Sequence, residues 1–352
     1  MGEFFTMHRL LARFYTPKID WLQVEVSSLC NSSCCYCPQS LEGVEGTLMT
    51  QQTFARLLPV FKKTKMVYLQ GWGEPFLHPH LFDFIRQAKK IGTKVGTTSN
   101  GTILDDGDLQ GLVDLELDVL GLSLAGQNDT SRKGTSLGKI LHIIKMLQEI
   151  RGAGKKPAIH IAYMLLRSQI ADLDTLYQSL HELAVDEIVL TTLPYAISPQ
   201  MEREMICNLE DEEQRSVEKA VFACSESFKK RGIPFYYYWK DENKEHGCTE
   251  RIESNAFVSA AGNVSPCVFH GAPHSAHSRN PRALCFGNIN EESFATIWRK
   301  KEYREFRTMH QSGKQHPVCE GCWKRQEVLR GACLPTIDPA TLFQALEPGR
   351  YF

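Results

Sequence analysis

The sequence predicts an α/β protein with a parallel sheet, open or curled into a partial barrel, followed by a smaller cysteine-rich domain. Short runs rich in β-branched residues alternate six times with amphipathic stretches between residues 21 and 193, as the β-α units of one parallel sheet do. After residue 235, cysteines separated by Gly, Pro and His replace this alternation, and the apolar content is too small for a self-sufficient core. Ligand sites in such sheets lie at the carboxyl ends of the strands.

The elements follow from these patterns in order. The expected strands are WLQVEV (21–26), KMVYLQ (65–70), KVGTTS (94–99), VLGLSL (119–124), AIHIAYMLL (158–166), EIVLTTL (187–193) and PFYYYW (234–239). Helices are expected over LFDFIRQAKKIG (81–92), LGKILHIIKMLQEIRGAG (137–154), an exposed charged stretch (210–232) and EESFATIWRKKEYREFRTMH (291–310). The expected domains are an N-terminal extension (1–20), the α/β part (21–200), a helical linker (201–235), the cysteine-rich domain (236–340) and a C-terminal tail (341–352).

Composition narrows the class of protein. With 40 basic and 41 acidic residues, the net charge of -1 provides no field for nucleic acid, and no segment approaches the roughly 18 apolar residues of a membrane span. The opening MGEFFTMHRLLARFY lacks the apolar stretch of a secretory signal, so a cytoplasmic protein is expected. In that reducing compartment, 12 cysteines indicate metal ligands or catalytic groups rather than disulfides.

Three cysteines follow the first expected strand as C-x3-C-x2-C, at Cys30, Cys34 and Cys37. A tight loop can direct three thiolates at one metal centre. Three ligands are one fewer than the four protein ligands of a fully ligated cubane cluster or a structural zinc. The open position could bind a ligand. Zinc would need a fourth protein ligand, and the first histidine after the loop is His78, beyond the next strand; Cys35 is expected to face away and pack.

This loop, with Tyr36 before the last cysteine, resembles the cluster loop of the radical SAM enzymes. The resemblance implies a partial (β/α)6 TIM-like barrel in which Cys30, Cys34 and Cys37 hold a catalytic 4Fe-4S cluster. It further implies that S-adenosylmethionine chelates the fourth iron, is reductively cleaved, and gives a 5'-deoxyadenosyl radical that abstracts hydrogen from the substrate.

A second match is VYLQGWGEPFLHP, at the end of the next strand. It resembles the family's glycine-rich turn, which implies that Gly71, Trp72, Gly73 and Glu74 bind the methionine amino group, although Trp72 replaces a glycine. By position after the third and fourth strands, the family implies further cofactor contacts from Ser99, Asn100 and Ser123, together with Tyr36. Arg132 resembles the arginine that follows the fourth strand, and an exposed arginine that opens a helix is the alternative.

The C-terminal cysteines Cys248, Cys267, Cys319 and Cys322 are similar in arrangement to the SPASM domain of radical SAM maturases, including the turn at 287–289 and a helix around Trp298. This implies one auxiliary 4Fe-4S cluster held by these four thiolates. Two alternatives stay open: Cys285 and Cys333 could complete a second auxiliary cluster, and the four cysteines could form a zinc ribbon. Cys207 and Cys224 are expected to pack. Exposed or substrate-facing positions are expected for His270, His274 and His277.

The resemblance implies a maturase that modifies a peptide, a protein or an enzyme cofactor, with a ferredoxin or flavodoxin as electron donor. A branch of about this length is associated with maturation of tungsten or molybdenum aldehyde oxidoreductases, which the short tail suits. Action on a small-molecule biosynthetic intermediate is one alternative, and a non-enzymatic iron-sulfur or zinc protein is the other. The interpretation predicts no nucleic-acid or membrane partner.

Overall fold

One curved sheet runs through the protein. The computed structural model describes residues 18–124, 132–134, 136–240, 247–273, 283–314 and 316–332. The strands of the sheet are β1 (Ile19–Val24), β3 (Thr64–Leu69), β4 (Lys94–Ser99), β5 (Val119–Leu124), β7 (Ala158–Leu165), β8 (Glu187–Thr192), β9 (Phe235–Lys240), β10 (Asn255–Val258), β11 (Asn263–Ser265), β12 (Gly287–Asn288) and β13 (Glu327–Ala332). Their order is β12-β11-β10-β1-β3-β4-β5-β7-β8-β9-β13.

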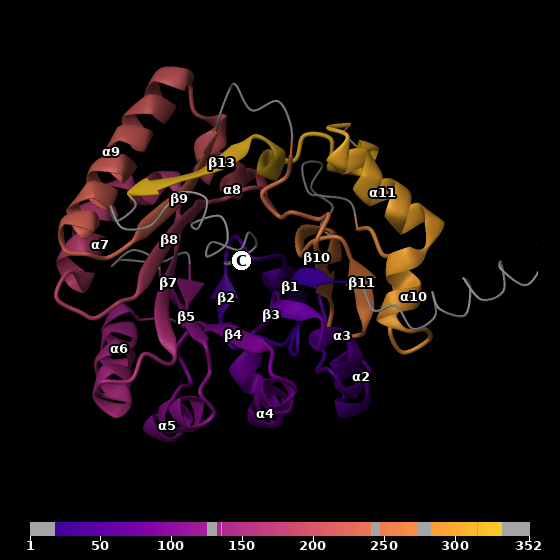
Figure 1. Cartoon of the computed structure of the whole chain (residues 1–352). Coiled ribbons are helices and arrows are strands. Elements are labelled where there is room, and N and C mark those ends of the chain that lie inside the picture. The colour runs from indigo at the N-terminus through magenta and orange to yellow at the C-terminus, as the bar shows by residue number, and fades with distance from the viewer. Residues whose placement is uncertain are drawn as a thin grey trace, which may run out of the picture.

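Parallel pairing holds the central part of the sheet together. Each of β1, β3, β4, β5, β7, β8 and β9 pairs in parallel with the next, and β10 lies parallel to β1 on the other side. The sheet bends into an open arc, visible in Figure 1, with β13 near one end and β11 near the other. The α/β fold with a largely parallel sheet is confirmed, and all six strands expected from the alternation are present.

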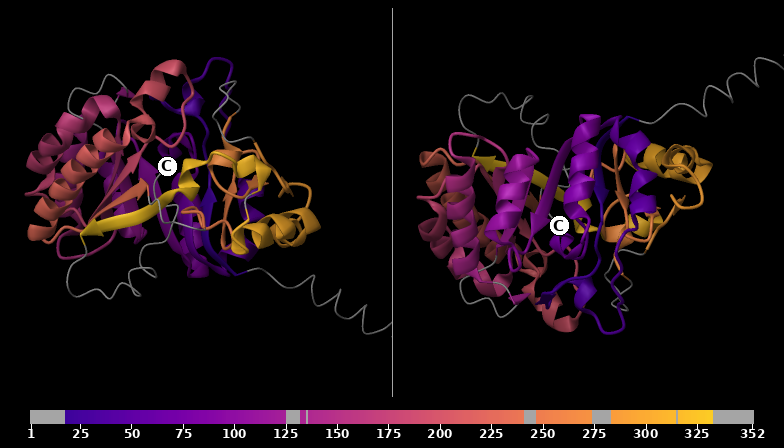
Figure 2. Two further views of the ribbon diagram at one scale, coloured as in Figure 1. Left: turned by 90° about the horizontal axis from the view of Figure 1, so that it is seen from above. Right: turned by 90° about the horizontal axis from the view of Figure 1, so that it is seen from below.

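Helices cover the outer side of the arc. The helices of the described residues are α2 (Gln51–Ala55), α3 (Leu58–Phe61), α4 (Leu81–Ile91), α5 (Asp106–Asp114), α6 (Leu137–Arg151), α7 (Leu173–Leu180), α8 (Pro199–Glu204), α9 (Asp211–Lys230), α10 (Phe294–Arg299) and α11 (Lys301–Gln311). Figures 1 and 2 show α4, α5, α6, α7 and α9 outside the strands that they connect. Their apolar faces bury Phe84, Ile144, Leu176 and Phe228 in the same core as the strands.

Local sequence explains where the helices begin and end. Thr50 accepts a hydrogen bond from the backbone N–H of Thr53 and caps α2, while Asp105 and Asp108 form a reciprocal capping box at α5. Gly92 ends α4 at a φ of 89°, a left-handed conformation that glycine adopts without steric cost. The expected helix around 81–92 is therefore confirmed with its glycine stop.

The C-terminal residues extend the sheet at both edges. The hairpin of β10 and β11 adds to β1, whereas β13 pairs antiparallel with β9 at the opposite end. The expected strand at 234–239 is β9, which lies between β8 and β13; its first five residues are buried, and Phe235 stacks on Phe228 of α9. The charged helix α9 packs one face, including Val221 and Phe228, against the core and exposes the other.

The expected single helix over 291–310 is two helices, so that prediction was wrong. Lys300 separates α10 from α11 with an extended conformation, φ −51° and ψ 143°. Its ammonium group donates to the carbonyl of Phe286 and pairs with Glu292. Arg307 of α11 in turn donates to the carbonyl of Trp298 and lies over its ring. The side-chain hydrogen bonds of Lys300 and Arg307 across the break outweigh the helix propensity of the sequence.

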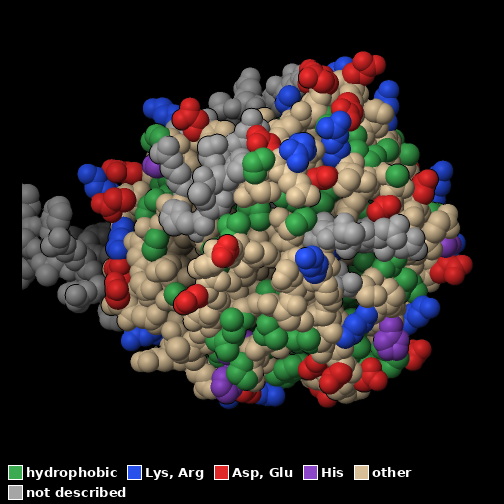
Figure 3. All heavy atoms as spheres, turned by 180° about the vertical axis from the view of Figure 1, so that it is seen from behind, with side chains coloured by type: hydrophobic (Ala, Val, Ile, Leu, Met, Phe, Trp, Pro, Cys, Tyr) green, Lys and Arg blue, Asp and Glu red, His purple; other side chains and the backbone are tan. Residues whose placement is uncertain are grey.

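The face of the molecule in Figure 3 intersperses Lys and Arg side chains with Asp and Glu side chains. This mixture agrees with the nearly balanced charge of the chain. No helix in the part of the chain that the structure describes is long and apolar enough to span a bilayer.

Candidate functional site

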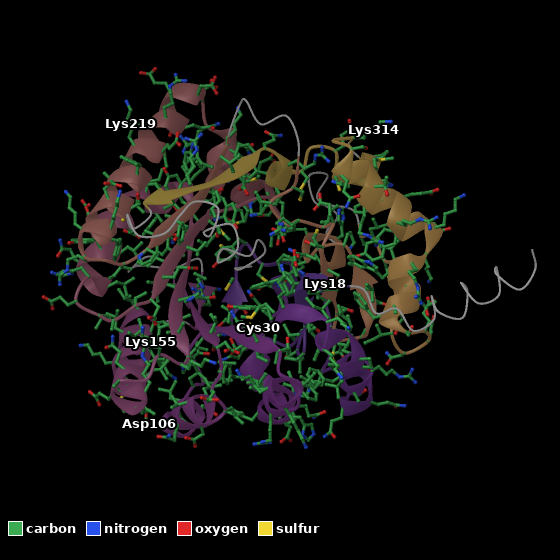
Figure 4. The ribbon with its side chains drawn as sticks, in the orientation of Figure 1. Lys18, Cys30, Asp106, Lys155, Lys219 and Lys314 are labelled. Carbon is green, nitrogen blue, oxygen red and sulfur yellow. The ribbon has the colours of Figure 1, made fainter. Side chains whose placement is uncertain are left out.

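The first cysteine loop lies inside the arc, past the end of β1. Figure 4 shows Cys30 within the concave side of the sheet, while Asp106 and Lys155 mark its outer rim. Within the loop, β2 (Ser33–Cys34) pairs antiparallel with β6 (Arg132–Lys133), which holds the loop against the segment after β5. The thiol of Cys30 accepts the backbone N–H of Ser32 at 3.4 Å.

One cavity of about 150 Å³ opens at this loop, at the carboxyl ends of the strands. The sequence-predicted residues that line it are Cys30, Cys34, Tyr36, Cys37, Gly71, Trp72, Gly73, Glu74, Ser99, Asn100, Ser123 and Arg132. The structure therefore brings together every residue expected at the first cluster and its cofactor. Arg132 is buried, so the alternative of an exposed helix-opening arginine was wrong.

The GWGEP turn reaches the cysteine loop because two of its positions carry no side chain. A Cβ on Gly73 would lie 2.5 Å from the carbonyl oxygens of Ser27 and Leu29, and one on Gly71 would lie 2.3 Å from Cγ of Glu25. The backbone N–H of Glu74 donates to the carbonyl of Leu29 at 2.8 Å. Glycine here permits the close approach of two backbones.

The Glu74 carboxylate is buried and takes its hydrogen bonds from the protein. Oε1 accepts from the hydroxyl of Ser99 at 2.9 Å and the backbone N–H of Phe76 at 3.2 Å, and Oε2 accepts from the backbone N–H of Asn100 at 2.7 Å. Burial raises the pKa of Glu74 to about 7 against these donors and the nearby positive charge of Arg132. Glu74 thus joins the end of β3 to the end of β4 at the cavity wall.

Asn100 connects the end of β4 to the cysteine loop. Its side-chain amide donates to Asn31 Oδ1 at 2.9 Å and to Ser32 Oγ at 3.1 Å, and it lies 4.0 Å from the sulfur of Cys30. Through these contacts, the side chain of Asn100 holds the cysteine loop in place, and its amide hydrogens are engaged by protein acceptors.

Trp72, the departure from the family turn, contacts the C-terminal part of the chain. Its indole N–H donates to the carbonyl of Val268 at 3.2 Å, and its ring meets Tyr195 and Phe269 edge-on at centroid distances of 5.9 and 6.2 Å. The Cys37 thiol lies 3.7 Å from the carbonyl oxygen of Trp72. The turn therefore touches both cysteine regions.

Two thiols of the loop, Cys30 and Cys37, are poor acids. Burial raises the pKa of Cys37 to about 12, and it also raises the pKa of Cys30, because a thiolate is costly in a dry site. Negative charge on the neighbouring thiols adds to both shifts. Binding of a metal centre must therefore displace protons from this loop.

Several lining residues escaped the sequence analysis. They are Ser32, Gln39, Ser40, Gln70, Thr98, Met164, Leu193, Pro194 and Tyr195. Met164 lies near the end of β7, and residues 193–195 directly follow β8. The end-of-strand rule that selected Ser99 and Ser123 would also have found these positions.

The second cysteine set gathers at the C-terminal end of the molecule. Burial raises the pKa of Cys248 and Cys267 well above the usual range, and that of Cys319 and Cys322 to about 12 and about 11. Charge on Cys322 and Cys319 adds to the shift of Cys248, and charge on Cys248 and Cys322 adds to that of Cys267, so these thiols lie within electrostatic reach of one another.

Backbone N–H groups point at three of these sulfurs. The donors belong to Glu250 for Cys248, His270 for Cys267 and Lys324 for Cys322. In the described ranges between residues 18 and 332, no group of three or more His, Cys, Asp or Glu side chains converges on a position for a single metal ion.

Three expectations about other residues have clear outcomes. Both ring nitrogens of His78, the histidine considered as a zinc ligand, are engaged by other partners: Nε2 contacts the Met49 carbonyl at 2.8 Å and Nδ1 accepts the His80 N–H at 3.0 Å. Cys35 was expected to pack, and this was wrong: the side chain is exposed, although its sulfur lies 3.5 Å from Met201 Sδ. Cys224 packs in the core as expected.

The expectation for His270 was wrong. Its loop is rich in Gly, Pro and Ser, which is typical of a surface, but the short 3-10 turn η5 (Phe269–Gly271) directs the ring inward, and the side chain is buried beside Cys319. His274 and His277 lie outside the described residues, as does Cys333. Cys285 is described and exposed.

Family models match both regions. Residues 24–180 match the radical SAM superfamily, and residues 248–323 match an iron-sulfur cluster-binding domain called SPASM. The chain is a radical SAM enzyme with a SPASM domain. The sequence-based interpretation of the family is confirmed, and so are the cofactor classes that it carries: a 4Fe-4S cluster, S-adenosylmethionine and an auxiliary iron-sulfur centre.

Relatives agree over most of the chain. A tungsten-containing aldehyde ferredoxin oxidoreductase cofactor-modifying protein of Pyrococcus furiosus is 26% identical over 331 residues, covering 90% of this chain and 89% of the relative. An Fe-coproporphyrin III synthase of Methanosarcina barkeri is 23% identical over 302 residues, covering 80% and 73%. SuiB of Streptococcus suis, solved bound to S-adenosylmethionine, shares the fold with a TM-score of 0.64 at 13% identity, over 89% of this chain and 73% of that one.

Proposed function

We propose that this radical SAM enzyme cleaves S-adenosylmethionine at the cavity beside Cys30, Cys34 and Cys37, and uses the radical to modify the cofactor of a partner enzyme. One observation supports the site above all others: the three thiols line the same cavity as the glycine-rich turn and the polar strand ends. Three thiolates leave one iron of a cubane without a protein ligand, which is where a substrate-like group can bind.

The residues that line the cavity fit a 4Fe-4S cluster and S-adenosylmethionine. Cys30, Cys34 and Cys37 would hold a 4Fe-4S cluster, and the cavity wall formed by Gly71–Glu74, Ser99 and Ser123 would bind the cofactor. The chemistry that the cluster supplies when bound is one-electron reduction, which cleaves S-adenosylmethionine to a 5'-deoxyadenosyl radical. Tyr195, Leu193 and Met164 give the cavity an apolar side that excludes water from the reacting atoms.

The second set fits one auxiliary cluster. Cys248, Cys267, Cys319 and Cys322 supply four thiols, and N–H donors aimed at sulfur stabilise the thiolate form that a cluster requires. Four protein ligands leave no iron open to substrate. This ligand set favours electron relay over direct substrate binding.

The substrate class rests on the Pyrococcus furiosus relative, whose name describes modification of a cofactor in another enzyme and which aligns with nine-tenths of this chain. The solved relatives named for peptides, including SuiB bound to its precursor peptide SuiA, share only the fold. We propose a ferredoxin or flavodoxin as electron donor and a cytoplasmic location, as the sequence analysis predicted.

The test combines iron analysis with cofactor cleavage. Anaerobically reconstituted wild type should hold about eight irons, and a Cys30/Cys34/Cys37→Ala variant about four, since each cubane contributes four. With dithionite, only the wild type should form 5'-deoxyadenosine, and only its reduced EPR signal should change when S-adenosylmethionine is added.

Cys35→Ala is the matched control, because Cys35 belongs to the same loop but lies outside the cavity. It should keep the iron content and the cleavage activity. A wild type that binds the cofactor without cleaving it would contradict the proposed chemistry. Cleavage coupled to a purified small molecule with no protein partner would favour the alternative of a small-molecule biosynthetic enzyme.

A further inference from the structure

The sulfur of Cys319 differs from its three neighbours in the side chains that surround it. It lies 3.4 Å from Nε2 of His270 and 3.6 Å from Nε2 of His310. Cys319 and both histidines are buried, with side chains no more than 6% exposed. His310 comes from the last turn of α11, and Cys319 ends the 3-10 turn η6 (Pro317–Cys319). Imidazole groups thus occupy the surroundings of this one sulfur.

Arg325 determines which nitrogen of His310 carries the proton. Its Nη1 lies 3.1 Å from Nδ1 of His310. A guanidinium group has donors only, so Nδ1 must accept. The hydrogen of the neutral ring therefore resides on Nε2, the atom that faces the sulfur of Cys319. The arrangement is a relay in which Arg325 donates to His310 and His310 donates to Cys319.

Packing holds the relay in place. The ring of Phe306, one turn earlier on α11, lies against His310 with centroids 4.8 Å apart. Arg325 ends the 3-10 turn η7 (Trp323–Arg325), and its backbone N–H donates to the carbonyl of Cys322 at 3.2 Å. The arginine is therefore anchored to the same C-x2-C segment that supplies Cys319 and Cys322.

We propose that His310, oriented by Arg325, is a positioning residue that donates a hydrogen bond to the Cys319 sulfur and thereby raises the reduction potential of the auxiliary cluster. This inference rests on the proposed function, which assigns the four cysteines to that cluster. A hydrogen bond to a ligand sulfur stabilises the more negative, reduced state, and such bonds are among the determinants of cluster potential. The relay thus adjusts how readily the auxiliary centre accepts an electron.

The test measures the midpoint potential of the auxiliary cluster by EPR-monitored titration. The Cys30/Cys34/Cys37→Ala protein serves as the parent, so that one cluster contributes to the signal. His310→Leu removes the donor, whereas His310→Gln keeps an N–H at a similar reach. His310→Leu should lower the midpoint potential relative to the parent. In His310→Gln the potential should remain close to that of the parent.

A second pair of variants, Arg325→Gln and Arg325→Leu, tests Arg325. Both substitutions remove the positive charge. Arg325→Gln keeps a donor for Nδ1 of His310, and Arg325→Leu does not. The potential should be lower in Arg325→Leu than in Arg325→Gln. Equal potentials in this pair would overturn the relay, because charge alone would then explain the shift. This pair decides the question even where His310→Leu loses its iron.

Iron content separates this inference from its premise. A parent with about four irons and an unchanged potential in His310→Leu would overturn the role of His310 alone. A parent without iron would overturn the auxiliary site itself, and the role of His310 with it. Cofactor cleavage by the wild type is measured separately and tests the first site.

Discussion

At the scale of single residues, Glu25 joins three parts of the molecule. It follows β1 directly, and its side chain is only 4% exposed. Oε1 accepts the backbone N–H of Trp72 at 2.9 Å, and Oε2 accepts that of Ala260 at 3.1 Å. One carboxyl group therefore holds the glycine-rich turn and the β10–β11 hairpin to the end of the first strand.

The titration of Glu25 should make stability depend on pH. Burial raises the pKa of Glu25 to about 7 from an unfolded value near 4.5, although both backbone donors oppose the shift. Because the folded pKa is raised, this contribution to stability is full below the unfolded pKa and is lost as pH rises through 7. The free energy of unfolding should fall by about 3 kcal/mol at complete titration.

Glu25→Gln isolates this effect. The amide does not titrate, and its NH2 group faces a backbone donor, which adds an offset that does not change with pH. Denaturant unfolding of both reconstituted proteins at pH 5.5, 6.5 and 8 should show the wild type losing stability relative to the variant as pH rises. Parallel curves at all three values would contradict the raised pKa.

Cys285 provides a second test at this scale. It is exposed, and its thiol lies 3.3 Å from the carbonyl oxygen of Gly287, in the turn that leads to α10. The proposal of one auxiliary cluster predicts that Cys285→Ala keeps the full iron content, about eight per chain. Iron and labile sulfide analysis checks this. Loss of about four irons would instead indicate a second auxiliary cluster.

At the scale of elements, the turn between β3 and α4 must touch the cysteine loop. Gly73→Ala would place a methyl group 2.5 Å from the backbone of residues 27–29, and backbone cannot move aside as a flexible side chain can. The turn should retreat, and Glu74 should lose its backbone bond to Leu29. We expect this variant to lose the first cluster and to retain about four irons. The EPR response to S-adenosylmethionine should be lost as well.

Gly138→Ala is the matched control for that substitution. Gly138 lies in the first turn of α6, and the nearest atom to a new Cβ is Ser136 Oγ at an ordinary 3.7 Å. Alanine favours a helix over glycine by about 1 kcal/mol, so this variant should be as stable as the wild type or more so. Full iron in Gly73→Ala would show that the turn tolerates a side chain.

Elements were more predictable than their ends and connections. Strand-rich alternation located β1, β3, β4, β5, β7 and β8 because a buried parallel strand needs a continuous apolar run. Strand order then brought Cys30, Gly73 and Asn100 to one cavity. The break at Lys300 could not be predicted, because lysine favours a helix and its partners, Phe286 and Glu292, lie in the connecting segment before α10, whose path the sequence does not encode. The inward turn of His270 likewise depends on packing, which local composition does not encode.

The contacts of Trp72 also could not be predicted from local sequence. The sequence marked it only as a departure from a glycine, whereas its indole contacts Val268, Tyr195 and Phe269. Those partners lie more than 100 residues away in the chain, so no local pattern could connect them. A tryptophan at this position fits a protein whose turn packs against its own C-terminal domain.

At the scale of the whole molecule, the boundary between the barrel and the C-terminal domain is bridged by the sheet itself. The strand β10 pairs with β1 from Trp21 to Val24, and β13 pairs with the full length of β9 at the opposite end. Glu25 and Trp72 add hydrogen bonds to Ala260 and Val268 across the same boundary. The two family regions therefore share one continuous core.

This continuity predicts that the radical SAM region does not fold stably by itself. A chain ending at residue 240 would expose both edges of the sheet, at β1 and at β9, and unpaired edges promote aggregation. It would also uncover the buried faces of Phe235 and Tyr237, whose neighbouring strand is β13. We expect the 1–240 protein to be insoluble or aggregated in size-exclusion chromatography, under conditions where the full chain elutes as a discrete species. A soluble 1–240 protein that binds about four irons would instead make the barrel an autonomous domain, and would limit the C-terminal strands to covering its edges.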